Sequence, residues 1–159
     1  SLGARMIFKA LLILAERQAK AKTEHTIEFE DDDNKEREKE KEKKKKDKKT
    51  PKIWDDGKDE AQGMVMDVIL MGAPVTSDTS VWEQVRSVVS GRLINVYSHT
   101  DWILRMLCRT NELSYSLAGI QEISDVKNME NVDVNDLVAS HFDYDKALPK
   151  IMQRIKFYP

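Results

Sequence analysis

Three polar residues of this chain have the types and the order that acyl transfer requires. Ser1 stands directly before a helix-forming segment, while Asp101 and His141 each follow an apolar run that is typical of a strand. In such a set the serine hydroxyl attacks a carbonyl carbon, the histidine takes and returns its proton, and the aspartate orients the histidine. We therefore take these three residues as candidate catalytic residues.

The surroundings of Ser1 carry half of the pattern expected for a nucleophile at a sharp turn from strand to helix. Such a turn needs small residues, usually Gly-Xaa-Ser-Xaa-Gly, and only Ser1-Leu2-Gly3 is present here. The order serine, aspartate, histidine along the chain matches that of α/β-hydrolases. Two alternatives stay open for Ser1: an arbitrary first residue, or an N-terminal nucleophile that uses its own amine.

The other candidates also have simpler interpretations. Asp101 has the position of an N-cap for the helix that follows, and this role is compatible with a catalytic one. His141 could instead mark the entry to a helix or lie on the surface. His99 is close enough in sequence to Asp101 to compete with His141 for it, and His25 is expected to be solvated.

The pattern of apolar residues predicts a helix over residues 2–21 and then an alternation of strands and helices. We expect strands at 65–71, 93–98 and 132–134, and helices at 80–89, with Ser80 as N-cap, at 101–109 and at 143–157, while 113–123 is ambiguous. Strands separated by helices imply a parallel α/β sheet, whose carboxyl-end edge carries the working residues. Three short strands with open edges are expected to be half of a larger domain.

Residues 22–62 predict a charged, disordered insertion between two packed parts. The window 28–49 holds 10 acidic and 10 basic residues, with one large apolar residue, Phe29. Such a tract buries too little apolar area to offset its ordering entropy. Its lysine block could alternatively bind a protein or an anionic lipid surface.

The overall composition excludes several classes of protein. With 26 Lys+Arg against 28 Asp+Glu there is no cationic surplus for nucleic acid. The single cysteine, Cys108, excludes a disulfide framework within the chain and a cysteine-based zinc site, and is interpreted as a small core residue. The tryptophans and methionines are interpreted as core or pocket lining, so we predict no metal and no other cofactor. No apolar run is long enough to span a bilayer, and the abrupt start suggests a piece of a longer protein.

Several segments together resemble the DUF726 family, the relatives of transmembrane and coiled-coil domain-containing protein 4. The opening Ser1-Leu-Gly-Ala-Arg5 matches the end of that family's Gly-Tyr-Ser-Leu-Gly-Ala-Arg turn. The other matching segments are Val68-Ile-Leu-Met-Gly-Ala-Pro74, Gly91-Arg-Leu-Ile-Asn-Val-Tyr97, Asp101-Trp-Ile-Leu104, Leu117-Ala-Gly-Ile120, Glu130-Asn-Val-Asp-Val134 and Ser140-His141. The chain departs from the family in its charged insertion and in having nothing upstream of the serine.

The resemblance implies a partial α/β-hydrolase fold from an intracellular, membrane-associated protein of the endomembrane system, anchored by segments outside this chain. Residues 1–21 would be the nucleophile helix, 22–62 the insertion and 63–159 the C-terminal part of the domain. Ser1, Asp101 and His141 would form the triad, with the Leu2 backbone N–H as one oxyanion donor. The second donor would come from an earlier strand, so the isolated chain is expected to be inactive.

The implied function is that of a serine hydrolase acting on an ester, with a lipid-derived substrate as the expectation. A rival interpretation is a hydrolase-like protein that no longer catalyses and serves membrane trafficking or partner binding, with the insertion as its interaction surface. A third is a degenerate fragment without a stable fold. Reactivity of the serine distinguishes the hydrolase from the non-catalytic protein. A cooperative thermal unfolding transition would exclude the degenerate fragment.

Overall fold

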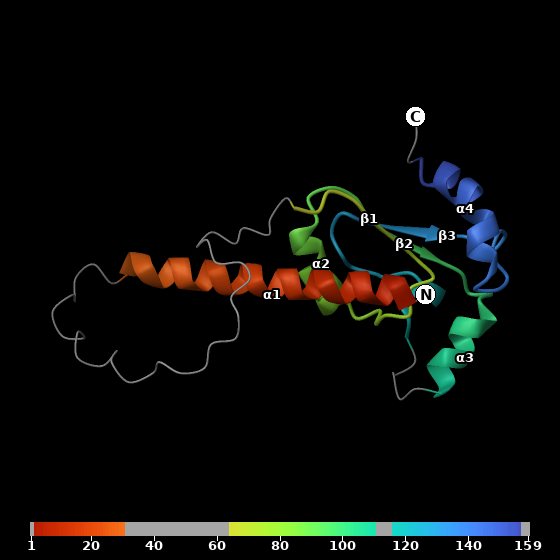
Figure 1. Ribbon diagram of the computed structural model, residues 1–159, viewed down its shortest axis with the longest axis horizontal. Helices are drawn as coiled ribbons and strands as arrows, with labels where there is room; N and C mark the ends of the chain where they lie inside the picture. Colours follow the sequence, from red (N-terminus) through yellow and green to blue (C-terminus); the bar gives the residue numbers. More distant parts are fainter. Residues whose placement is uncertain (1, 31–63, 111–115, 157–159) are drawn as a thin grey trace.

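The computed structural model describes residues 2–30, 64–110 and 116–156, and it has an α/β fold. Three parallel strands form a sheet of order β1-β2-β3, flanked by helices (Figure 1). The predicted alternation of strands and helices is confirmed. The elements are α1 (Leu2–Glu30), β1 (Val68–Met71), α2 (Thr79–Val88), β2 (Leu93–Tyr97), α3 (Trp102–Thr110), the 3-10 turn η2 (Ala118–Ile120), β3 (Met129–Asp133) and α4 (Asp143–Arg154).

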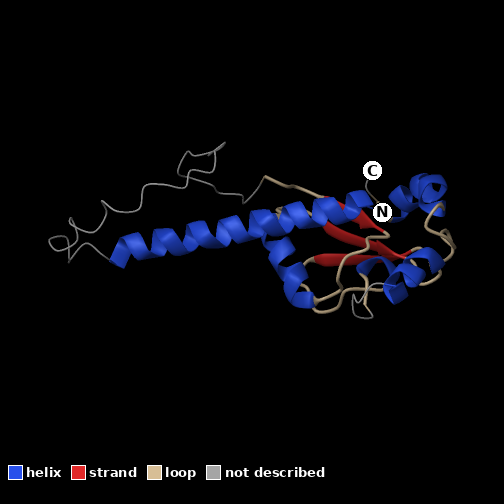
Figure 2. Cartoon of the chain, turned by 60° about the horizontal axis from the view of Figure 1, so that its bottom comes forward, coloured by secondary structure: helices blue, strands red, loops and turns tan. Residues whose placement is uncertain are grey.

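The two faces of the sheet bury two separate apolar clusters. Alternate residues of each strand point to opposite faces, so neighbouring positions such as Leu93 and Ile94 enter different clusters. The cluster with Leu93 lies under α1 and α2, and the cluster with Ile94 lies under α4. All five residues of β2, the middle strand of the sheet, are buried. Figure 2 shows the sheet with helices around it.

Helix α1 is longer than its sequence pattern predicts. Its first half packs on the sheet through Phe8, Leu11 and Ala15, and the Phe8 ring lies 4.8 Å from that of Trp82 between centroids. The helix then continues to Glu30, nine residues beyond the predicted end at Ala21, and extends past the sheet (Figure 1). Lysine and glutamate, which make up four of the nine residues from 22 to 30, favour helix. Helix α1 therefore overlaps the start of the predicted insertion.

Helix α2 begins one residue earlier than predicted, because Asp78 and not Ser80 is its N-cap. The Asp78 carboxylate accepts hydrogen bonds from the Ser80 backbone N–H at 2.9 Å and from its hydroxyl at 2.7 Å. The buried face of the helix consists of Trp82, Val85 and Val88, while Val81 is only half-buried. The Trp82 indole N–H is satisfied by the Thr76 carbonyl at 2.7 Å.

Some boundaries differ from the predicted ones for identifiable reasons. Val65 makes only an isolated bridge, so β1 starts at Val68. Strand β3 starts at Met129, three residues before the predicted 132, and its polar Glu130 and Asn131 pair with β2 although they bury little area. Helix α4 ends at Arg154. Of the ambiguous stretch 113–123, the part from 116 onward contains η2, and residues 111–115 lie outside the described residues.

The segment around η2 closes the carboxyl end of the sheet. Gly119 donates its N–H to the Ala73 carbonyl at 3.0 Å, and its own carbonyl accepts from the Ser98 N–H at 3.1 Å. A Cβ at Gly119 would lie 2.6 Å from the Ala73 nitrogen and from the Gly72 carbonyl carbon. Only a glycine therefore allows this segment to tie the end of β1 to the end of β2.

Candidate active site

Asp101 and His141 are brought into contact at the carboxyl end of the sheet. His141 Nδ1 lies 2.8 Å from Asp101 Oδ2, although the two residues are 40 positions apart in the chain. The Asp101 side chain is completely buried and the His141 side chain is 20% exposed. An aspartate at Nδ1 leaves Nε2 as the nitrogen that can exchange a proton with a reacting group.

Asp101 uses its two carboxylate oxygens for two purposes. Oδ1 accepts a hydrogen bond from the Leu104 backbone N–H at 3.1 Å, which caps the first turn of α3. Oδ2 faces the His141 imidazole. Asp101 therefore makes the N-cap contact and the histidine contact together, which the sequence allowed. The cap holds the carboxylate in a fixed orientation behind the imidazole.

A network of small polar side chains joins the two loops that carry this pair. The hydroxyls of Ser98 and Thr100, at the end of β2, both donate to the Val138 carbonyl, at 2.7 and 2.6 Å. Asn135 accepts from the His99 backbone N–H at 2.6 Å through its side-chain oxygen. The sequence interpretation missed these residues, whose only signal is that they are hydroxyl and amide residues just beyond strand ends.

The turn that presents His141 is held by Asp143. Its carboxylate accepts hydrogen bonds from the backbone N–H groups of Ala139 and Ser140, at 3.2 and 2.7 Å. Asp143 is also the first residue of α4, where a negative charge is favoured by the helix dipole. The imidazole is therefore presented from a turn whose backbone donors are satisfied.

Tyr144 packs against both His141 and the end of β1. Its ring meets the imidazole edge-on, with 5.7 Å between centroids, and a Cβ at Gly72 would lie 2.6 Å from Tyr144 Cε2. Gly72 also has a positive φ of 52°, which favours glycine. The Tyr144 hydroxyl is buried and has no hydrogen-bond partner among the described residues. Burial, helped by the Asp101 charge, raises the pKa of this hydroxyl well above its ordinary value, so it stays protonated.

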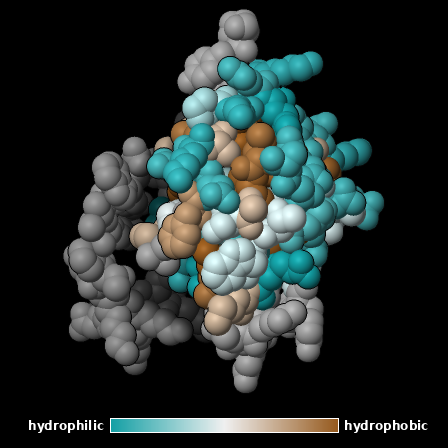
Figure 3. All heavy atoms as spheres, turned by 90° about the vertical axis from the view of Figure 1, so that its right-hand side faces the viewer, coloured by the Kyte–Doolittle hydropathy of each residue, from teal (hydrophilic) through white to brown (hydrophobic). Residues whose placement is uncertain are grey.

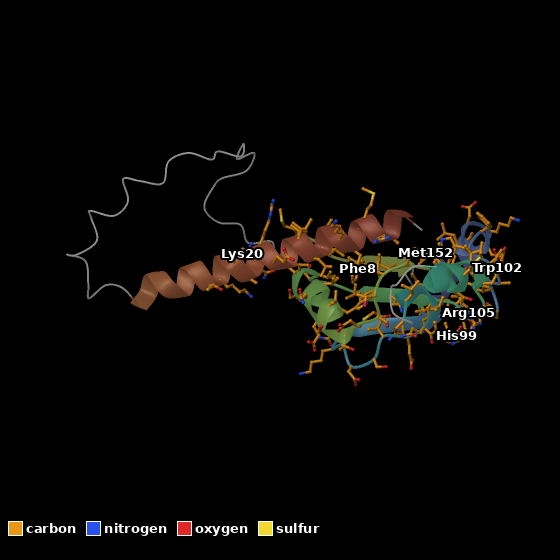
Figure 4. All side chains as sticks on the ribbon, turned by 90° about the horizontal axis from the view of Figure 1, so that it is seen from below. Phe8, Lys20, His99, Trp102, Arg105 and Met152 are labelled. Atoms are coloured by element: carbon orange, nitrogen blue, oxygen red, sulfur yellow. The ribbon has the colours of Figure 1, made fainter. Side chains whose placement is uncertain are left out.

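His99 does not compete for Asp101. Its Nδ1 lies 2.8 Å from the Ile120 carbonyl oxygen, and its Nε2 lies 3.9 Å from an oxygen of Asp133. The side chain is 56% exposed, and Figure 4 shows it near Arg105 at the end of the sheet. Because Ile120 accepts a hydrogen bond from Nδ1–H, this histidine belongs to a separate surface pair.

The remaining predicted residues lie at or beyond the limits of the described structure. Ser1 lies outside the described residues, as do the side chains of His25 and Cys108. Leu2 is the first residue of α1, and that end of the helix lies at the same end of the molecule as α3 and α4 (Figure 1). Trp82 belongs to the core, while Trp102 is 58% exposed and is not a core residue. The alternative interpretation of Trp102, as pocket lining, stays a prediction.

Across residues 2–30, 64–110 and 116–156, no three His, Cys, Asp or Glu side chains gather in a way that could hold a metal ion. In the same part of the chain, no helix combines the length and the apolar character needed to cross a bilayer.

Comparison with known proteins finds relatives among membrane proteins and one named as a lipase. The chain is 45% identical over 101 residues to transmembrane and coiled-coil domain-containing protein STS1 of Oryza sativa subsp. japonica, covering 62% of this chain and 15% of that protein. It is 40% identical over 100 residues to an uncharacterized membrane protein of Caenorhabditis elegans, covering 62% of this chain and 16% of that protein. It is 37% identical over 99 residues to the Saccharomyces cerevisiae protein named "Probable lipase MIL1", covering 62% of this chain and 9% of that protein.

The chain thus spans less than a sixth of the length of each of these three relatives. No solved structure matches it significantly. The family model described as "Protein of unknown function (DUF726)" matches residues 56–158, which is more than half of the chain and includes Asp101 and His141. The chain therefore belongs to the DUF726 family, as the motifs in its sequence predicted.

Proposed function

We propose that this chain contributes the catalytic aspartate and histidine, and the serine, of a serine hydrolase that acts on esters. The observation that carries the proposal is the 2.8 Å contact between a buried Asp101 carboxylate and His141 Nδ1 at the carboxyl end of a parallel sheet. In the full-length protein Ser1 is the nucleophile, His141 the general base and acid, and Asp101 the residue that fixes the imidazole tautomer.

The proposed reaction proceeds through a covalent acyl-enzyme. Ser1 Oγ attacks the ester carbonyl carbon while His141 Nε2 takes its proton, and the histidine then returns this proton to the leaving alcohol. Water, activated by the same nitrogen, releases the acid. Asp101 stabilises the imidazolium that forms in both steps, and its burial strengthens this interaction because no water screens it.

The Leu2 backbone N–H is the proposed donor to the oxyanion. It belongs to the first residue of α1, and N–H groups at a helix start have no partner within the helix. The partial positive charge of a helix N-terminus favours a developing negative charge there.

A lipid-derived ester in or near a membrane is the proposed substrate class. Support comes from the names of the relatives, two of which are membrane proteins and one of which is named as a lipase. Membrane association of the full-length protein is part of the same proposal.

The proposal is tested by labelling the full-length protein with a fluorophosphonate, which reacts only with an activated serine. We expect labelling that is lost in Ser1→Ala and reduced at least about 10²-fold in His141→Gln, because the base is removed. The matched control is His99→Gln, which removes the other histidine at this end of the sheet and should leave the labelling rate unchanged. Absence of labelling in a well-folded protein would refute the hydrolase and favour a non-catalytic role in membrane trafficking or partner binding.

A further inference from the structure

The imidazole of His141 is held, within the described part of the chain, by one hydrogen bond and one ring contact. The hydrogen bond from Nδ1 to Asp101 fixes the tautomer, but by itself it lets the ring turn about the N–H···O line. The side chain is 20% exposed, and Figure 3 looks onto this end of the molecule, where hydrophobic side chains gather between hydrophilic ones. Because part of the imidazole faces solvent, its plane has to be fixed from the protein side.

The ring of Tyr144 makes the contact on that side. It meets the imidazole edge-on, with an interplanar angle of 67° and 5.7 Å between centroids, which is an arrangement that aromatic pairs prefer. Tyr144 lies in the first turn of α4, and it packs against the apolar cluster that contains Ile94 and Ile151. The tyrosine ring is therefore joined to the core, whereas the histidine lies in the turn before the helix.

Gly72, at the end of β1, leaves the space that this ring occupies. A Cβ at Gly72 would lie 2.6 Å from Tyr144 Cε2 and 2.9 Å from Cζ, so any larger residue there would displace the ring. The contacts thus run from Gly72 through Tyr144 and His141 to Asp101. Strand β1 carries none of the candidate catalytic residues, yet its end limits where the imidazole can lie.

The ring of Tyr144 makes these contacts, and its hydroxyl does not. The hydroxyl is buried and has no hydrogen-bond partner among the described residues, so it anchors neither His141 nor the end of β1. Tyr144→Phe keeps the ring and removes the hydroxyl, whereas Tyr144→Leu removes the ring. The two variants therefore separate the role of the ring from that of the polar group.

We propose that Tyr144 is a positioning residue whose ring fixes the plane of the His141 imidazole, so that Nε2 points at the reacting group. This rests on the proposed function for what Nε2 reaches, whereas the fixed imidazole is a property of the chain itself. The ring also keeps water from one side of the contact between Asp101 and His141, which leaves that interaction less screened. A displacement of about 1 Å in a catalytic group can cost about 10²-fold in rate.

Nitrogen NMR spectroscopy of isotope-labelled histidines in the chain tests the fixed imidazole without any reaction. At a pH where the imidazole is neutral, we expect His141 to carry its proton on Nδ1 alone, and its ring to show nuclear Overhauser contacts with that of Tyr144. Tyr144→Phe should keep both features. Tyr144→Leu should give a mixture of tautomers, because water then competes for Nδ1. Far-UV circular dichroism of each variant shows that the fold is retained.

The matched control is Tyr97→Leu. The Tyr97 ring meets the other histidine at this end of the sheet, His99, edge-on, with 5.2 Å between centroids. Its removal is the same change beside a different imidazole, so the tautomer of His141 should stay unchanged.

The rate of fluorophosphonate labelling of the full-length protein tests the consequence for Nε2. Tyr144→Leu should slow labelling at least about tenfold, while Tyr144→Phe and Tyr97→Leu should label at the wild-type rate. Gly72→Ala should also slow labelling, because it displaces the ring without removing it. It provides the same test if Tyr144→Leu does not fold.

Three results would overturn the inference. They are the absence of contacts between the two rings in the wild-type chain, a single His141 tautomer in a folded Tyr144→Leu variant, and an equal loss of labelling in Tyr144→Phe or Tyr97→Leu. The NMR measurement does not depend on Ser1. A wild-type protein that keeps one His141 tautomer and does not label would therefore count against the proposed function alone.

Discussion

Replacing Asp101 separates its two contacts, because the two oxygens serve different partners. Asparagine keeps an oxygen that can accept from the Leu104 N–H, and it is a good capping residue. It loses the charge that faces His141, and its amide group favours the wrong imidazole tautomer. Alanine loses both contacts. Comparing Asp101→Asn with Asp101→Ala therefore distinguishes a catalytic carboxylate from a helix cap.

The expected magnitudes follow from the burial of the site. For Asp101→Ala, loss of the cap costs about 0.5–2 kcal/mol and the unpaired imidazole nitrogen about 1–3 kcal/mol. Little of this is recovered from water, because the Asp101 side chain has no exposed surface. We expect a loss of roughly 2–4 kcal/mol in the free energy of unfolding. For Asp101→Asn the expected loss is about 1 kcal/mol, while the labelling rate falls by roughly 10³–10⁴.

Urea denaturation of the chain measures the first quantity, and the rate of fluorophosphonate labelling of the full-length protein measures the second. Asp125→Asn is the matched control, because Asp125 is exposed and its positive φ of 63° suits asparagine as well as aspartate. It should leave both quantities nearly unchanged. Labelling at the wild-type rate in Asp101→Asn, together with a loss of stability in Asp101→Ala, would refute the triad and leave Asp101 as a cap only.

Three further predictions concern the packing around the site and the edge of the sheet. Tyr144→Phe should raise the free energy of unfolding by about 1 kcal/mol, because it removes a buried hydroxyl without a partner among the described residues. Gly72→Ala should lower the free energy of unfolding by about 2 kcal/mol, because the added Cβ clashes with the Tyr144 ring. Urea denaturation measures both changes. Arg92 lowers the pKa of Glu130 below its ordinary value of 4.5. The pair therefore stabilises the fold above that pH. The free energy of unfolding should exceed that of Glu130→Gln by less than about 1 kcal/mol, because both groups are partly exposed, and this difference should fade as the pH falls through the lowered pKa of Glu130. Denaturation at a series of pH values measures the difference, and a constant difference would contradict the prediction. Asn131→Ala should cost about 1–2 kcal/mol in thermal unfolding, because it leaves the N–H and C=O of Ile123 without their side-chain partner.

Local patterns in the sequence predicted most of the elements and failed where burial is partial. The apolar run at 93–97 indicated a strand because β2 is buried on both faces. Strand β3 lies at an edge and holds Glu130 and Asn131, so its apolar signal covers only part of its length. The N-cap at Asp78 was missed because the carboxylate and the serine hydroxyl two residues later are both good capping groups.

Residue types, spacing and motifs were enough to predict the family, the order of the elements, and Asp101 and His141 as candidate site residues. The contact itself depends on how the elements pack, because His99 is two residues from Asp101 along the chain and His141 is 40, yet His141 is the histidine that reaches the carboxylate. The chain leaves β2 in a direction that turns His99 toward the Ile120 carbonyl, while the turn before α4 returns His141 to the carboxylate. The same holds for Tyr144, whose contact with Gly72 joins α4 to β1 across the sheet. Contacts of this kind depend on how the elements pack, and no local pattern encodes them.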